Sequence, residues 1–344
     1  MAVAAIPTEI FFPCSNMYLL CVVRRQALRT LSSRVDIKRL TLKRGGLKVM
    51  KLALHSVSYS GAWEGQCCLP LKRFVSKAAE FGYDGIELMA KRPHASPLDL
   101  DEKARNDLKE FIRSKNLEIA CIAAYNDFAD PNPYHREVEL LYLKETIHLA
   151  HDLGAKIVRI FASGMKDMHS GASYTQQWNW VKEHIREAVK YAEDQGVILA
   201  LQNHSPIMQS YKNVLAMVKE VESENLKVTL DAPLLYISGE SLPEAVRETG
   251  KLMVHSHTSD YIRRPGALEY SSGGFRRVET LETPPLGEGE IDYQTFVKLL
   301  REIDYQGFLS YEICSPIVGK GEETNLDSYA KNSLQYMRKL LAET

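Results

Sequence analysis

Residues 198–206, ILALQNHSP, look like a buried strand that ends in polar side chains. The apolar part, ILAL, is short and uninterrupted, which is typical of a strand buried on both faces of a parallel sheet. Gln202, Asn203 and His204 follow it at once. In a parallel barrel the carboxyl ends of the strands gather on one rim, where active sites lie. This stretch therefore indicates a functional site at the end of a strand.

Apolar runs of the same kind recur along the chain from residue 50 onward. Amphipathic segments separate them, and several stop at a glycine, as the predicted helix over 71–81 does at Gly82. The alternation predicts a single-domain (β/α)8 TIM barrel. A doubly wound open sheet is the alternative, disfavoured because no GxGxxG follows the first strand. The eight predicted strands are 51–56, 85–90, 117–125, 157–163, 198–204, 227–233, 252–260 and 308–313.

The segment 261–291, after the seventh predicted strand, is longer than an ordinary barrel connection. Loops of this length without an obvious element of their own are usually functional or disordered. Its arginines and aromatic residues favour a long lid over the rim.

Composition excludes several classes of function. The chain has 344 residues, of which 45% are hydrophobic and 25% charged, with a formal net charge of -1. This balance favours neither nucleic acid nor a membrane surface as a partner, and no apolar run approaches the roughly 20 residues of a membrane-spanning helix. The six cysteines show no CxxC spacing, which is typical of a reduced cytoplasmic protein. The sequence leaves the oligomeric state open, a homo-oligomer included.

The first 49 residues differ from the rest, with many Arg and Lys but only Glu9 and Asp36 as acids. We interpret residues 1–49 as a disordered or non-native leader, with translation starting at Met50 and the barrel spanning 50–344. A basic transit peptide and a genuine helical extension are the alternatives.

Four residues at or near the ends of the last four strands form a candidate metal site. Gln202, Asp231, His257 and Glu312 offer an amide, two carboxylates and an imidazole. This oxygen-rich set suits Mn²⁺, Mg²⁺ or a similar divalent ion. The alternative for each residue alone is that it ends a strand and meets solvent or a helix N-terminus.

Other polar residues near strand ends are candidates for catalysis or substrate binding. Glu312 is the candidate base, with His204 as a second proton carrier or a helix cap. Glu87 binds substrate or forms a buried pair with Arg159. The candidate substrate-binding residues are Asn203, His255, Glu87, Arg159 and His55, of which His55 is also an alternative proton carrier.

The motifs IVRIFAS, ILALQNH, VTLDAP, VHSHTSD and PLGEGEID followed by GFLSYEI resemble the sugar phosphate isomerase/epimerase family of xylose isomerase-like barrels. The similarity covers about residues 50–340. It implies that Gln202, Asp231, His257 and Glu312 hold a divalent metal. Two positions depart from the family: Gln202 stands where Glu is usual, and Leu234 stands where the sugar 3-epimerases carry a substrate-binding His.

The resemblance implies a metal-dependent isomerase or epimerase that removes a proton next to a carbonyl of a small carbohydrate. Because an amide is not basic, Gln202 cannot exchange protons as the family's Glu does. The alternatives are a lyase on the same scaffold, cleaving a keto glycoside or dehydrating a keto acid, and a non-catalytic sugar-binding barrel. The related apurinic endonucleases use more metal ligands than this chain offers. They also use a basic groove, which the charge of this chain does not favour.

Overall fold

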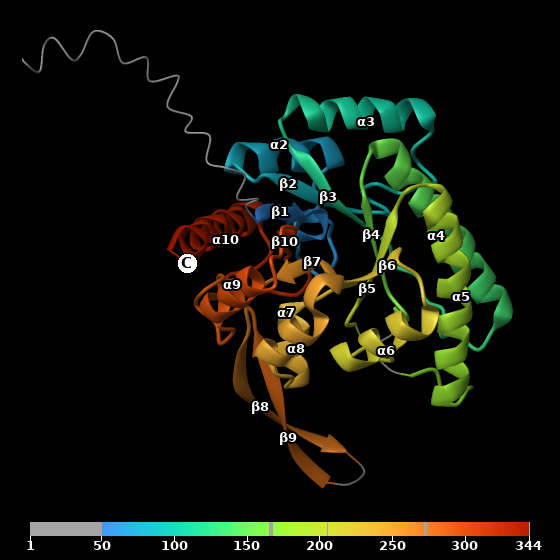
Figure 1. Cartoon of the computed structure of the whole chain (residues 1–344). Helices are drawn as coiled ribbons and strands as arrows, with labels where there is room; N and C mark the ends of the chain where they lie inside the picture. The colour runs from blue at the N-terminus through green and yellow to red at the C-terminus, as the bar shows by residue number, and fades with distance from the viewer. Residues whose placement is uncertain (1–49, 165–167, 205, 272–273, 344) are drawn as a thin grey trace, which may run out of the picture. The chain divides into compact units, whose positions relative to one another are not determined.

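The strands of this chain close into a parallel barrel, as predicted (Figure 1). The computed structural model describes residues 50–343 except 165–167, 205 and 272–273, so the interpretation of 1–49 lies outside the described residues. Around the barrel the order is β1, β10, β7, β6, β5, β4, β3 and β2, closing on β1. The strands are β1 (Lys51–His55), β2 (Gly85–Met89), β3 (Glu118–Ala123), β4 (Ile157–Ile160), β5 (Ile198–Gln202), β6 (Leu226–Thr229), β7 (Met253–Thr258) and β10 (Phe308–Tyr311).

Helices follow the strands and surround the barrel in Figure 1. α2 ends at Gly82 as predicted, and α4 ends at Gly154, because these glycines adopt positive φ angles of 91° and 80°. The helices are α2 (Leu71–Phe81), α3 (Glu102–Ser114), α4 (Pro133–Leu153), α5 (Tyr174–Asp194), α6 (Tyr211–Val221), α7 (Ala232–Ser238), α8 (Leu242–Thr249), α9 (Tyr293–Glu302) and α10 (Glu323–Glu343). Two short 3-10 turns, η2 (Ser56–Tyr59) and η3 (Gly250–Leu252), adjoin β1 and β7.

The register of the sheet brings polar side chains together inside the barrel. His55 pairs with Glu87 on the neighbouring strand, and Glu87 pairs with Cys121 on the next. Because side chains alternate across a strand, His255 and His257 share one face of β7. The remaining buried surface is largely apolar, so these polar residues form a distinct cluster within a hydrophobic core.

The long segment after β7 contains a hairpin of two antiparallel strands, β8 (Ile262–Ser271) and β9 (Gly274–Glu282). In Figure 1 this hairpin projects from the barrel. The sequence predicted a long lid here, and the structure adds regular pairing that the sequence pattern did not show. No helix within the described residues is long and apolar enough to cross a bilayer.

Candidate functional site

The four predicted metal ligands lie together at the carboxyl ends of four neighbouring strands. Gln202 is the last residue of β5 and His257 lies near the end of β7. Asp231 caps α7 just after β6, and Glu312 directly follows β10. His257 Nδ1 is 3.1 Å from Asp231 Oδ2 and 3.7 Å from Glu312 Oε1. The four residues therefore form one cluster, called here the ligand cluster.

Gln202 completes the ligand cluster with an amide whose nitrogen has hydrogen-bond partners and whose oxygen has none in the described part of the chain. Its Nε2 donates to Asp231 Oδ2 at 2.6 Å and lies 3.3 Å from His257 Nδ1. Its Oε1 is buried and has no hydrogen-bond partner among the described residues. A buried polar atom without a partner costs free energy, on the order of 1–3 kcal/mol. Because Nε2 rather than Oε1 faces Asp231 and His257, this oxygen could bind a metal in the cluster only after the amide turned over.

The charges of the ligand cluster perturb its proton affinities. Burial raises the pKa of Glu312 to about 7, and the nearby carboxylate of Asp231 acts in the same direction. Burial alone would lower the pKa of His257, but the carboxylates around it, chiefly Glu312, raise that pKa well above its ordinary value. A carboxyl group with a pKa near neutrality can both accept and donate a proton, which suits general acid–base catalysis.

Asp231 is held in place through its backbone as well as its side chain. Asn203 Oδ1 accepts the Asp231 N–H at 2.7 Å, and Asn203 Nδ2 donates to the Asp231 carbonyl oxygen at 3.2 Å. Asp231 Oδ1 accepts the N–H of Leu234, which caps α7. Both polar atoms of the Asn203 side-chain amide thus fix Asp231. The sequence predicted substrate binding for Asn203 and did not predict this role.

His204 and Arg159 are linked through the ring of Phe161. The His204 ring stacks on Phe161 with 4.0 Å between centroids, and His204 remains half-buried. The guanidinium of Arg159 lies 4.1 Å from the centre of the same ring. Arg159 does not extend to Glu87 as one prediction had it, but donates from Nη1 to the carbonyl oxygen of Ala124 at 2.7 Å.

Glu87, His255 and His55, all predicted to bind substrate, have no exposed surface. The Glu87 carboxylate contacts the ring nitrogens of His255 and of His257 instead. Burial lowers the pKa of His55 to about 3, so that its ring is neutral. With no exposed surface, these side chains support the ligand cluster from within the barrel.

The HTSD and PLGEGEI motifs meet at Asp260. Its carboxylate accepts main-chain N–H groups from Gly287, Gly289 and Ile291. A Cβ on Gly289 would lie 2.1 Å from Asp260 Oδ1, so only glycine allows this approach. The contact ties the chain that follows the hairpin to the end of β7, close to His257.

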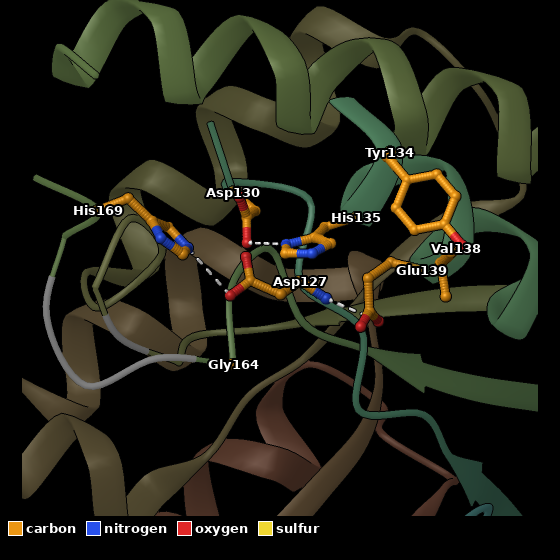
Figure 2. A pocket seen from close by; sticks show the side chains of 8 residues that line it. All are labelled: Asp127, Asp130, Tyr134, His135, Val138, Glu139, Gly164 and His169. Atoms are coloured by element: carbon orange, nitrogen blue, oxygen red, sulfur yellow. Dashed lines mark hydrogen bonds and ion pairs between the residues drawn. The ribbon is translucent and has the colours of Figure 1, made fainter. Parts of the chain in front are cut away.

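A hollow of about 500 Å³ lies between the loops that follow β3 and β4 (Figure 2). Asp127 Oδ2 is 3.2 Å from His169 Nε2, and Asp130 Oδ2 is 3.0 Å from His135 Nδ1. Glu139 Oε2 accepts the N–H of Asp127. We call this hollow, lined by Asp127, Asp130, His135, Glu139 and His169, the rim hollow. The sequence reasoning did not predict it, although the acidic run NDFADPNP (126–133) was the available signal.

The ligand cluster is the better candidate for holding a divalent metal. It combines two carboxylates, an imidazole and an amide whose oxygen is orphaned, and it is largely buried. If the Gln202 amide turned over about its last bond, Oε1 would face Asp231 and His257, the direction a metal ligand requires. These donors are the types that Mn²⁺ and Mg²⁺ accept.

Comparison with known proteins places the chain in a family. The family described as "Xylose isomerase-like TIM barrel" matches residues 75–340, and the chain belongs to it. Fructoselysine 3-epimerase of Shigella flexneri is 25% identical over 289 residues, covering 80% of this chain and 95% of that protein. Inosose dehydratase of Clostridium botulinum is 25% identical over 256 residues, covering 69% of this chain and 80% of that protein.

A solved structure shows the same fold. D-psicose 3-epimerase, crystallised in the presence of D-fructose, superposes with a TM-score of 0.67 at 18% identity, covering 85% of this chain and 99% of that one. The predicted barrel and the predicted family are therefore both confirmed.

Proposed function

We propose that this protein is a metal-dependent isomerase or epimerase that removes a proton next to a carbonyl of a small carbohydrate. One observation carries the proposal: Asp231 Oδ2 and Glu312 Oε1 both approach Nδ1 of His257, beside the amide of Gln202. The relatives named as sugar epimerases support the substrate class.

Gln202, Asp231, His257 and Glu312 would hold the metal. When bound, a divalent ion supplies Lewis-acid polarisation of a substrate carbonyl. Glu312 takes the proton from the adjacent carbon, because the other carboxylate, Asp231, is committed to the Leu234 N–H and to Gln202 Nε2. In the metal-free protein burial raises the pKa of Glu312 to about 7. Gln202 has no basic atom, so it orients and does not exchange protons.

His204 is the proposed second proton carrier. It is half-buried, so its ring can exchange protons with water, and its stacking on Phe161 fixes the plane of that ring. His55, the alternative, is enclosed and neutral, and its Nδ1 accepts the N–H of Val57 at 3.3 Å. The structure therefore supports His204 over His55.

A lyase is the second candidate function, favoured by the relative named inosose dehydratase. Its first step would be the same proton removal, so Glu312 would serve both reactions. The product separates them: an isomer has the mass of its substrate, whereas a dehydration product has lost water.

The experiment is exchange of substrate protons in D₂O with Mn²⁺ and a panel of ketoses and inososes, followed by mass spectrometry. We expect deuterium at the carbon next to the carbonyl in a product of otherwise unchanged mass. Glu312→Gln should slow exchange by about 10²–10⁴-fold, the usual contribution of general acid–base catalysis. The matched control, Glu322→Gln on the exposed surface, should exchange normally. A wild-type protein that binds sugar without exchange would establish the non-catalytic alternative.

A further inference from the structure

Glu87 lies at the centre of the barrel, surrounded by three histidines. Its Oε2 is 2.8 Å from His255 Nε2, and both of its oxygens are 3.1 Å from His257 Nε2. Its Oε1 is 3.5 Å from His55 Nε2. Glu87 and His255 have no exposed surface, and neither has His55. No substrate atom could reach this carboxylate without displacing a histidine.

The protons of this arrangement follow from what each group can do. An ionised carboxylate only accepts hydrogen bonds, so a ring nitrogen bonded to Glu87 must carry a proton. His55 fits the same pattern, because its Nδ1 accepts the N–H of Val57 and leaves its proton on Nε2. The Nε2–H groups of His255 and His257 therefore both donate to Glu87, whereas His55 Nε2 lies 3.5 Å from it without a hydrogen bond.

His257 contacts both Glu87 and the ligand cluster, one with each ring nitrogen. Its Nε2 faces Glu87, whereas its Nδ1 faces Asp231 Oδ2 at 3.1 Å and Glu312 Oε1 at 3.7 Å. A histidine that binds a metal almost always donates its other N–H to a carboxylate or a carbonyl, which fixes the tautomer and the ring orientation. By the same rule Nδ1, which faces the Asp231 carboxylate, also carries a proton in the metal-free protein. A bound metal would replace that proton, while the proton retained on Nε2 keeps the ring oriented toward the ligand cluster.

We propose that Glu87 is a positioning residue that holds His257 as the Nε2–H tautomer, with Nδ1 presented to the metal; this inference rests on the proposed function. His255 holds the Glu87 carboxylate by a second hydrogen bond, and the His55 ring lies against its other oxygen at 3.5 Å. The role of a strand-two carboxylate is thus to organise a ligand on strand seven.

A rival interpretation uses some of the same atoms. Ligand atoms of Glu87, Cys121 and His255 all lie within 4.8 Å of one another, close enough for a second metal ion. An ion bound through His255 Nε2 would have to replace the hydrogen bond that this nitrogen already makes with Glu87 Oε2. The two interpretations differ in metal stoichiometry, one ion per chain against two.

Glu87→Gln tests the inference, because the amide replaces one acceptor oxygen by an NH₂ donor, so that His255 or His257 must lose its bond or change its protonated nitrogen. We expect Mn²⁺ affinity, measured by titration calorimetry, to fall by about 10–100-fold. Glu118→Gln, the same change at an exposed ion pair on the neighbouring strand, should leave the affinity unchanged. Elemental analysis of the wild-type protein should give one ion per chain, and two ions would overturn the inference.

A direct readout of the tautomer separates positioning from a loss of folding. In Mg²⁺-loaded protein carrying ¹⁵N-histidine, long-range ¹H–¹⁵N spectra should show His257 protonated on Nε2 in the wild type. Glu87→Gln should add a population protonated on Nδ1. Should Glu87→Gln not fold, Glu87→Asp keeps the charge, and we expect it to lose less affinity than 10-fold while retaining the Nε2–H tautomer.

The outcomes distinguish this inference from the proposed function. Unchanged Mn²⁺ affinity and an unchanged His257 tautomer in Glu87→Gln would overturn the role of Glu87 while leaving the metal site intact. Proton exchange that survives in Glu312→Gln would instead overturn the proposed function, whatever Glu87 does.

Discussion

The ligand cluster and the rim hollow are built from the same residue types but differ in how their polar atoms are satisfied. In the rim hollow Asp127 and Asp130 are partly exposed, and each pairs with a histidine and accepts a loop N–H group. In and beneath the ligand cluster, buried atoms of Gln202, His55 and His255 lack partners. Buried polar groups are normally bonded, so exceptions call for a ligand or a functional explanation.

The same comparison explains why the rim hollow is not assigned a metal. Its carboxylates are occupied by their own loops, which they fix in shape: Asp127 accepts from Ala129 N and Asp130 from Asn132 N. Figure 2 shows the two Asp–His pairs beside each other, but these side chains are not among the described groups whose ligand atoms lie within 4.8 Å of one another. The difference teaches that convergence and unsatisfied burial, rather than the number of acids, mark a metal site.

Removal of one aspartate from each region should give the largest difference in bound metal and turnover. Asp231→Ala should abolish bound metal and turnover, because it removes a converging carboxylate. Asp127→Ala should retain both, since its carboxylate serves the loop. Elemental analysis after purification with Mn²⁺ measures the difference.

Asp231 also caps α7, and losing a cap costs about 1 kcal/mol, so a folding defect must be separated from a binding defect. Asp231→Asn keeps an oxygen for the Leu234 N–H and serves as the second variant. A metal lost from Asp127→Ala and kept in both Asp231 variants would reverse the assignment of the two regions.

Sequence predicted the barrel and the ligand cluster because both depend on local pattern. Apolar runs and glycine stops located the strands, and the polar residue at each strand end then lay on one rim, as with Gln202 and His257. The partners of Glu87 were not predictable, since His255 and His257 are 168 and 170 residues away. The rim hollow was missed because the loop after β3 has no periodicity to interpret.

Asn203 shows a second limit of sequence reasoning. Its residue type and place at a strand end predict substrate binding, yet both of its amide groups bond to the backbone of Asp231. A side chain that fixes a neighbouring ligand has the same sequence pattern as one that touches substrate. Only the register between β5 and β6 distinguishes the two.

Gln202→Glu should make the ligand cluster more acidic than the rim hollow by adding a third carboxylate. A carboxylate at this position would be a better ligand than an amide, and we expect Mn²⁺ affinity to rise roughly tenfold, the order of one charge-assisted interaction. Without metal, the new charge next to Asp231 Oδ2 should lower the melting temperature. Calorimetric titration and thermal denaturation with and without Mn²⁺ measure both effects.

The control for this change is Gln306→Glu on the exposed surface, which should alter neither quantity. Weaker metal binding in Gln202→Glu would mean that position 202 does not face the ion. A gain in proton exchange as well would show that the glutamine limits the chemistry of this chain.

The smallest expected effect concerns the Asp127–His169 pair of the rim hollow. Both side chains are partly exposed, at 16% each, and the 3.2 Å pair should contribute about 0.2–1 kcal/mol to the free energy of unfolding. A double-mutant cycle with Asp127→Asn and His169→Gln, followed by urea denaturation, isolates that coupling. A coupling several times larger, or one that changes when Mn²⁺ is added, would show that the rim hollow binds an ion. The small value expected follows from solvent screening, which the buried ligand cluster escapes.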